Sequence, residues 1–440
     1  MGSSDQEQAR DAYGAGTGAL VCSVCGAEFP VGGMFHGCPS CGPSGAGSPL
    51  EYRAKIDAVS PAVFARPVAE GGTRGVWRYS ELLPPVRAAV SLGEGGTPLV
   101  ALPELGDQLG VQLYLKNETC NPTWSFKDRY VSVAVSVARE LGYTKVLCLS
   151  AGNFGHSASA YCARAGMECR VLCVPGASTM MRQAMQIHGA TVVTMPDGSE
   201  KTGLVRRLVD DEGWFPMTCL DPASASQIAN PFGPAGYKTI WYEVVSELGR
   251  VPDTVFVPVG GGDCLTGIWR GALEWRELGL ASTVPRLVGC QSSAAAPLVE
   301  AVRDGTGEIR EVAELPTRAL SIRHGRCSPT ALEAVRDSGG GAVAISDREL
   351  LDAIKLVARC GLLPEAASAT TIAAAVKMVG SGEHVGGTVV CVVTGSAAKW
   401  SDLMEELAGV EGGAAVRNEG EGRGRNRQAQ RMTRLGAVHD

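Results

Sequence analysis

The sequence lacks any uninterrupted apolar run long enough to cross a bilayer, and its first eighteen residues are polar where a secretory signal would be hydrophobic. Its formal net charge is -6, and its lysines and arginines are scattered, which leaves no basic face for nucleic acid. These absences argue against membrane and nucleic-acid partners and predict a cytoplasmic protein. With 440 residues, 45% of them hydrophobic, the chain can build two or three domains around a large core.

Lysine is also scarce, with nine among 40 basic residues. One of them, Lys127, lies in the segment 121–129, on a predicted turn between a strand at 111–116 and a helix at 130–140. Its neighbours carry hydroxyl, aromatic and charged groups, an environment in which a lysine can become a covalent anchor. A solvated surface lysine is the other interpretation, and this segment alone leaves both open. Asp128 and Arg129 are expected to form structural ion pairs.

Three glycine-containing loops follow Lys127 along the chain. Residues 150–156 come after the apolar run 146–149 and open a predicted helix. Residues 260–263 come after the apolar run 255–259 and precede a predicted helix at 265–274, and Thr394 ends the apolar run 389–393. A strand that leads through glycine into a helix presents free backbone N–H groups to an anion. Each loop alone is weak evidence, and their order after the lysine turn is stronger.

This order of motifs resembles the pyridoxal-phosphate (PLP) enzymes of the tryptophan synthase β fold, and most of all threonine synthase. The segment 121–129 is specific to that branch, and residues 93–99, 236–239, 328–332 and 365–369 match it as well. The resemblance covers about residues 90 to 405. It implies an α/β, fold-type II enzyme with two open twisted-sheet subdomains and the cofactor in the cleft between them.

The resemblance also implies roles for individual residues. Lys127 would be the catalytic residue that binds the cofactor covalently, Asn153 would bond the ring oxygen, and Thr394 would face the pyridine nitrogen. Such a hydroxyl partner leaves the ring a weaker electron sink than a carboxylate does, which favours elimination or replacement over amino transfer. The cofactor phosphate would be held by Gly260, Gly261, Gly262, Asp263 and Cys264. The substrate would be held by Ser150, Ala151, Asn153, Phe154, Gly155, His156 and Trp124.

The chain departs from the threonine synthase pattern at three positions that bear on the substrate. Trp124 stands where those enzymes carry glycine, Tyr130 where a small residue is common, and Gly233 at the place of an arginine that holds the substrate phosphate. Glycine cannot replace a bidentate phosphate partner, which weakens the case for homoserine phosphate. Trp124 and Tyr130 either tune the substrate or pack the core. His156 either relays a proton or makes a capping hydrogen bond.

The predicted function is therefore a PLP-dependent β- or γ-elimination or replacement on a small amino acid with an activated side chain. One alternative is β-replacement on phosphoserine or an O-acyl serine, as in cysteate or cysteine synthases. Another is a catalytically silent homologue with a regulatory role. Homodimers are usual in this fold, and we expect one here.

Most of the fifteen cysteines lie inside predicted strands and helices, as reduced buried residues do. Four are different: Cys22 and Cys25 form one Cys-x-x-Cys pair, Cys38 and Cys41 form another, and twelve residues separate the pairs. This spacing predicts a structural zinc ribbon, because so short a segment needs the metal in order to fold. A redox pair and a ribbon without metal are the alternatives. His36 is expected to be a surface residue.

The predicted domain organisation follows the chain from end to end. Residues 1–17 are expected to be disordered, 18–50 to form the ribbon, and 51–90 to connect it to the catalytic unit. The catalytic unit spans 91–410 and includes a small mobile subdomain at 145–212. Residues 411–440 are rich in Gly, Arg, Glu and Gln and are expected to be disordered.

Overall fold

The computed structural model describes residues 17–41, 48–64, 75–150, 152–173, 178–195, 199–218 and 228–409. The parts expected to be disordered, apart from Thr17, lie outside these ranges. The described residues up to Trp400 belong to one compact unit, and a helix, α13 (Ser401–Leu407), belongs to a second. Within the described ranges, no helix has both the length and the apolar character needed to cross a membrane.

A six-stranded sheet forms the larger part of the first unit, with the strand order β12-β11-β10-β13-β5-β4. All neighbouring pairs are parallel except β4, which runs antiparallel to β5 at one edge. The central strand β13 is buried along its whole length, as its continuous apolar run predicts for a parallel strand covered on both faces. The strands are β4 (Leu99–Ala101), β5 (Gln112–Asn117), β10 (Thr254–Pro258), β11 (Arg286–Ser292), β12 (Gly341–Ile345) and β13 (Thr388–Val393).

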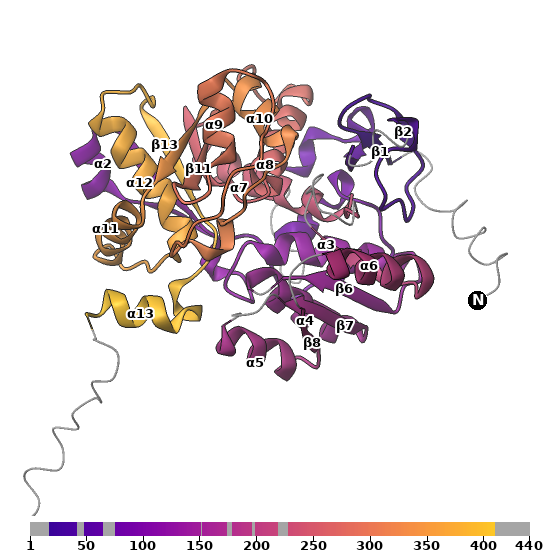
Figure 1. Ribbon diagram of the computed structural model, residues 1–440. Coiled ribbons are helices and arrows are strands. Elements are labelled where there is room, and N and C mark those ends of the chain that lie inside the picture. The colour runs from indigo at the N-terminus through magenta and orange to yellow at the C-terminus, as the bar shows by residue number, and fades with distance from the viewer. Residues whose placement is uncertain are drawn as a thin grey trace, which may run out of the picture. The chain divides into compact units, whose positions relative to one another are not determined.

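Helices cover this sheet. Those from the later part of the chain are orange and yellow in Figure 1. In the helix α12 every residue from 366 to 375 is buried, and the helix packs against β10, β11 and β13. The helices of this part are α2 (Pro103–Leu109), α7 (Lys238–Leu248), α8 (Asp263–Glu277), α9 (Pro297–Asp304), α10 (Pro329–Asp337), α11 (Asp347–Ala358) and α12 (Ala366–Gly380).

A second sheet has four parallel strands in the order β8-β7-β6-β9. Its strands and helices are β6 (Lys145–Leu149), α4 (Asn153–Ala165), β7 (Glu168–Cys173), α5 (Thr179–Ile187), β8 (Thr191–Thr194), α6 (Ser199–Arg206) and β9 (Phe215–Met217). The apolar run 146–149 and the helix predicted after it are confirmed as β6 and α4. The helix α3 (Lys127–Glu140) packs on α4 and also on a short 3-10 helix, η8 (Gly233–Tyr237), which leads into α7.

The N-terminal residues form a three-stranded antiparallel sheet of β1 (Gly18–Cys22), β2 (Glu28–Phe29) and β3 (Leu50–Ala54). It contacts the rest of the unit through specific bonds. The backbone N–H of Tyr52 donates to the Pro231 carbonyl at 2.9 Å, and Glu51 pairs with Arg270 of α8 at 2.7 Å. His36 is exposed, as expected, and lies 2.8 Å from a carboxylate oxygen of Asp210.

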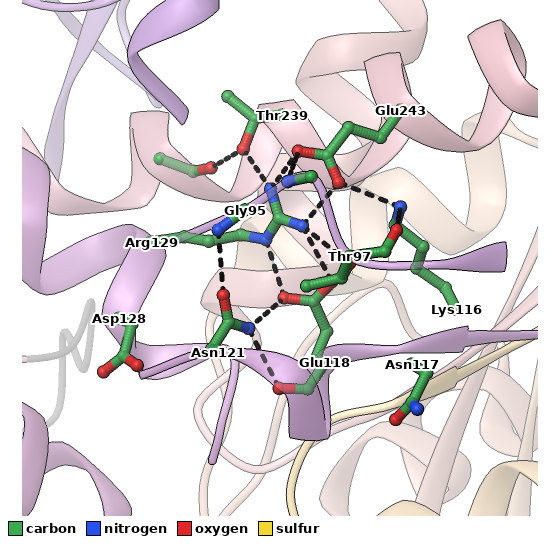
Figure 2. Close-up of polar contacts among 12 residues, drawn as sticks. Gly95, Thr97, Lys116, Asn117, Glu118, Asn121, Asp128, Arg129, Thr239 and Glu243 are labelled. Atoms are coloured by element: carbon green, nitrogen blue, oxygen red, sulfur yellow. Dashed lines mark hydrogen bonds and ion pairs between the residues drawn. The ribbon is translucent and has the colours of Figure 1, made fainter. Parts of the chain in front are cut away.

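The Arg129 guanidinium lies at the centre of a buried network that joins three distant segments (Figure 2). It donates to Glu118 at 2.6 and 2.8 Å and to Glu243 at 2.6 and 2.7 Å, and all three side chains are buried. Lys116 pairs with Glu243 at 2.9 Å. Burial alone would raise the pKa of Glu243, but the charges of Arg129 and Lys116 lower it to about 2. The ion pair expected for Arg129 is therefore confirmed.

We expect Arg129→Met to lower the free energy of unfolding by about 3–5 kcal/mol, because it leaves two buried carboxylates without their main partner. Urea unfolding followed by tryptophan fluorescence measures this loss. Arg87→Met is the matched control, since Arg87 pairs with Glu140 at an exposed position, and it should cost no more than about 1 kcal/mol. Equal losses for the two variants would contradict the central role of this network.

Candidate active site

Lys127 is the first residue of α3, and the turn before it is fixed by Asp128. The Asp128 carboxylate accepts the backbone N–H of Thr123 at 2.7 Å and also the hydroxyls of Thr123 and Ser157. Burial raises the pKa of Asp128 to about 6, although these hydrogen bonds act against the rise. Within the described part of the chain, Asp128 makes no ion pair. The ion pair expected for Asp128 is therefore wrong, because donors of its own turn and the Ser157 hydroxyl of α4 satisfy the carboxylate.

The Lys127 side chain lies among aromatic rings. Its Nζ is 4.5 Å from the ring centre of Phe126, 5.1 Å from that of Phe154 and 5.6 Å from that of Tyr237. Phe154 belongs to the first turn of α4, and Tyr237 ends η8. The lysine therefore points toward the loop 150–156 and lies half-buried between the two sheets' helices.

Thr394 follows β13, and its backbone carbonyl accepts the N–H of Phe126 at 2.9 Å. This bond joins the end of β13 directly to the lysine turn, and Ser125 and Gly395 pair as a β-bridge beside it. The Thr394 hydroxyl lies 2.9 Å from the hydroxyl of Ser368, which also accepts the N–H of Gly395. Ser368 thus orients the turn that carries Thr394.

Asn153 begins α4, and its amide nitrogen donates to both carboxylate oxygens of Glu365, at 2.9 and 3.1 Å. Glu365 is buried, precedes α12, and also accepts the Trp400 indole N–H at 2.9 Å. Asn153 Oδ1 is buried and has no hydrogen-bond partner within the described part of the chain, and the same holds for Ser125 Oγ. The first turn of α12 therefore positions both Asn153, through Glu365, and Thr394, through Ser368.

The loop 260–262 connects β10 to α8. Gly262 has a φ of 105°, in the left-handed region that favours glycine, and α8 begins at Asp263 with its backbone N–H groups unpaired by the helix. The Gly261 carbonyl accepts the N–H of Ser328 at 2.7 Å, which ties the loop to the start of α10. Burial raises the pKa of the Cys264 thiol, and the charge of Lys127 opposes this rise. Cys264, at the start of α8, is therefore close enough to Lys127 for their charges to interact.

Trp124 and His156 meet where the lysine turn faces α4. Trp124 has a φ of 59°, and within the described ranges it is the one residue other than glycine with a positive φ. Its ring is half-exposed and lies 6.1 Å from the His156 ring, which stacks on His188 at 5.6 Å. Burial, then the charges of Lys399 and His188, lower the pKa of His156 to about 4. His156 is therefore neutral at pH 7, and its Nδ1 has no described partner.

Tyr130 fills the space beside Gly233. A Cβ built on Gly233 would lie 2.2 to 2.4 Å from three ring atoms of Tyr130. The Tyr130 hydroxyl donates to the Thr218 carbonyl at 2.6 Å, and its ring meets Phe154 edge to face at 4.9 Å. Position 233 consequently accepts no side chain while Tyr130 keeps this place.

The structure thus brings most of the predicted site residues to the facing ends of the two sheets. Ser150 precedes α4 and its hydroxyl accepts the Gly152 N–H at 3.2 Å, whereas Ala151 lies outside the described residues. Two site-bordering groups that sequence reasoning did not assign are Glu365 and Lys399. Glu365 was noted only as part of a matching segment. No local pattern marks Lys399, a fully buried lysine whose Nζ donates to the Thr123 carbonyl at 3.1 Å.

Comparison with known proteins identifies the class to which this fold and site belong. Residues 90–395 match the family model described as pyridoxal-phosphate dependent enzyme. The threonine synthase of Methanocaldococcus jannaschii is 36% identical, over 87% of this chain and 93% of that protein. The threonine synthase of Mycobacterium tuberculosis is 41% identical, over 71% of this chain and 84% of that protein.

Solved structures agree with this fold. Maize serine racemase matches 71% of this chain and 93% of its own with a TM-score of 0.60 at 18% identity. The L-serine ammonia-lyase of Rhizomucor miehei matches 73% of this chain and 100% of its own, also with a TM-score of 0.60, at 20% identity. The chain belongs to the pyridoxal-phosphate-dependent enzymes and, among them, to the threonine synthase-like branch. The predicted family, α/β fold, cofactor and class of elimination or replacement chemistry are confirmed.

The buried neutral His156 gives the protein a specific acid sensitivity. Because its folded pKa of about 4 lies below the ordinary 6.5, stability is unaffected above about pH 6.5 and falls as the pH drops from there toward 4. Between pH 7 and pH 5 this costs at most about 2 kcal/mol. His156→Gln should lose less stability over this interval than wild type in urea unfolding. The exposed control His384→Gln should behave as wild type, and equal acid losses in all three proteins would refute the assignment.

Proposed function

We propose that Lys127 binds PLP covalently, and that the enzyme catalyses β- or γ-elimination or replacement on an amino acid with an activated side chain. The observation that carries this proposal is the convergence of distant segments on one lysine. Phe154 of α4 lies against its Nζ, and the Thr394 carbonyl is bonded to the residue before it. Covalent catalysis requires such a fixed amine beside groups that orient the cofactor.

The residues present fit the cofactor. Asn153 Oδ1 and Ser125 Oγ are buried polar atoms without described partners, as atoms awaiting a polar ligand are. The glycine loop with Asp263 and Cys264 presents the N-terminus of a fifteen-residue helix, which suits a phosphate. We assign Asn153 to the ring oxygen, this loop to the cofactor phosphate, and Thr394 to the ring nitrogen.

When bound, the cofactor supplies an electrophilic carbon and a sink for electrons from the substrate α-carbon. Lys127 is the group placed to take and return the α-proton. The backbone N–H groups at the start of α4, with Ser150, would hold the substrate carboxylate. Thr394 contributes a neutral hydroxyl already shared with Ser368, so it adds no charge at the ring nitrogen. This favours loss of a side-chain leaving group over amino transfer.

The N-terminal cysteines support a structural zinc site in our proposal. The four Sγ atoms lie within 4.8 Å of one another, and the pairs Cys22–Cys41 and Cys25–Cys38 are each 3.7 Å apart. Tetrahedral zinc with bonds of about 2.3 Å would set sulfurs about 3.8 Å apart. A disulfide would need about 2.0 Å, so the spacing favours metal over a redox pair.

We further propose the domain roles expected from the sequence. The ribbon (18–50) is followed by a connecting region (51–90) and the catalytic unit (91–410). Within that unit, the four-stranded sheet region (145–212) closes over the cofactor, and the enzyme acts as a homodimer. Support comes from the separate sheets, and from the bond of Asn153 to Glu365, which links the smaller sheet's region to the larger one.

Borohydride reduction of the purified enzyme with PLP should fix one cofactor on Lys127, which peptide mass spectrometry would locate. Lys127→Ala should lose the adduct and reduce activity by several orders of magnitude, because no other amine replaces it. Lys355→Ala, at an exposed position on α11, is the control and should retain both. An unmodified Lys127 in the wild type would contradict the proposal and favour the catalytically silent homologue.

Metal analysis should find about one zinc per chain, because four thiolates complete a structural site. Cys38→Ser should reduce the zinc content well below that level and lower the melting temperature. Cys360→Ser, an exposed cysteine far from the ribbon in sequence, should match wild type in both measurements. A wild-type zinc content well below one per chain rules the site out.

A further inference from the structure

We infer that the donor amino acid carries an uncharged leaving group, such as an acyl ester, and not a phosphate. The inference rests on the proposed function and narrows its substrate class. A phosphate monoester brings a charge of about -1.5 to -2 at pH 7, and a buried site tolerates such a charge only with cationic partners. The question is therefore which buried cations the described residues can offer.

Four lysine and arginine side chains are buried in the described part of the chain, and all are already engaged. Arg129 is saturated by Glu118 and Glu243, and Lys116 pairs with Glu243 and with Glu247 at 2.8 Å. Taking away the partners of Glu118 or Glu243 would leave a buried charge unpaired, which is costly.

The other two are Lys238 and Lys399. Lys238 pairs with Glu274 at 2.8 Å. Lys399 is bonded to the Thr123 carbonyl, and burial lowers its pKa to about 8, although Glu365 and Asp128 act to raise it. Its charge thus balances two buried carboxyl groups of the site. Lys238 is thus ion-paired, and Lys399 lies near two carboxyl groups whose charges oppose its own.

The side chains around the Lys127 amine are aromatic rings and not cations. Phe126, Phe154 and Tyr237 surround its Nζ, and Tyr130 stands behind Phe154 and Tyr237 at ring distances of 4.9 and 5.7 Å. His156, on the other side, is neutral at pH 7.

Position 233 cannot supply a cation either. No cationic side chain can project from position 233, because the Tyr130 ring already fills the position of its Cβ. Tyr130 is held there by its bond to Thr218 and cannot swing aside without losing it. An aromatic lining of this kind suits an apolar acyl group.

The reaction balances with such a donor. In a serine ester, the α-proton passes to the Lys127 amine and the bond between Cβ and the ester oxygen breaks. In a homoserine ester, the amine returns this proton and takes one from Cβ, and the bond between Cγ and the ester oxygen breaks. Its electron pair leaves with a singly charged carboxylate, and an unsaturated amino acid remains. No oxidant or reductant is needed.

Four donors test the inference on the holoenzyme: O-acetyl-L-serine, O-acetyl-L-homoserine, O-phospho-L-serine and O-phospho-L-homoserine. Release of acetate and phosphate is measured at matched chain length. We expect kcat/KM to be at least about 100-fold higher for the better acetyl ester than for its phosphate counterpart, which corresponds to about 2.7 kcal/mol. Equal or faster release of phosphate, or no release from any of the four, overturns the inference.

Two variants test whether the Tyr130 ring beside Gly233 is what excludes a phosphate ester. Tyr130→Ala combined with Gly233→Arg opens the filled space and places a cation in it, so phosphate-ester turnover should rise at least about tenfold over Tyr130→Ala alone. No rise in a folded double variant that keeps the Lys127 adduct would contradict the role given to this pair. If the variants do not fold, the donor series on wild type still decides. Loss of the adduct in wild type, by contrast, would refute the proposed function itself.

Discussion

The buried contact of Arg129 with Glu118 and Glu243 is the constraint on which the site depends. Arg129 is two residues after Lys127, and its guanidinium is buried in the core. Its ion pairs therefore fix the first turn of α3. Glu118 follows β5, and Glu243 lies in α7, so the network binds the lysine turn to the large sheet and to the η8–α7 segment. A buried ion pair stabilises little compared with apolar packing, but it tolerates only one geometry. That geometry determines where the lysine lies.

The same logic appears on the opposite side of the site, at the start of α12. Glu365 and Ser368 bond Asn153 and Thr394, which come from different sheets. The first ten residues of the helix are all buried, so these two polar groups stand on a rigid element. Precise positioning of a cofactor requires such support, because side chains held only by solvent-exposed loops would sample many orientations. The two sheets are therefore connected through the residues that we propose to hold the cofactor.

The sequence was informative wherever chemistry follows a local pattern. Apolar runs that end in glycine predicted β6, β10 and β13 and the loops after them, because buried parallel strands are continuously apolar. The partners of Asn153 and Arg129 could not be predicted, since Glu365 and Glu243 lie 212 and 114 residues away. The charge of Asp128 predicts an ion pair, whereas the hydroxyls of Thr123 and, from α4, of Ser157 satisfy its carboxylate. The relation of Tyr130 to Gly233 likewise appears only in the packing.

Trp124 shows how the departures from the family pattern depend on one another. A φ of 59° is strained for a bulky residue and costs of order 1 kcal/mol or more. Two backbone bonds hold it there: its N–H donates to Asn121 at 2.8 Å, and its carbonyl accepts from Ser396 at 3.2 Å. The turn thus keeps a conformation suited to glycine while carrying an indole that faces His156. Together with the Tyr130 ring beside Gly233, this adds aromatic surface near the lysine turn, in keeping with the uncharged leaving group that we infer.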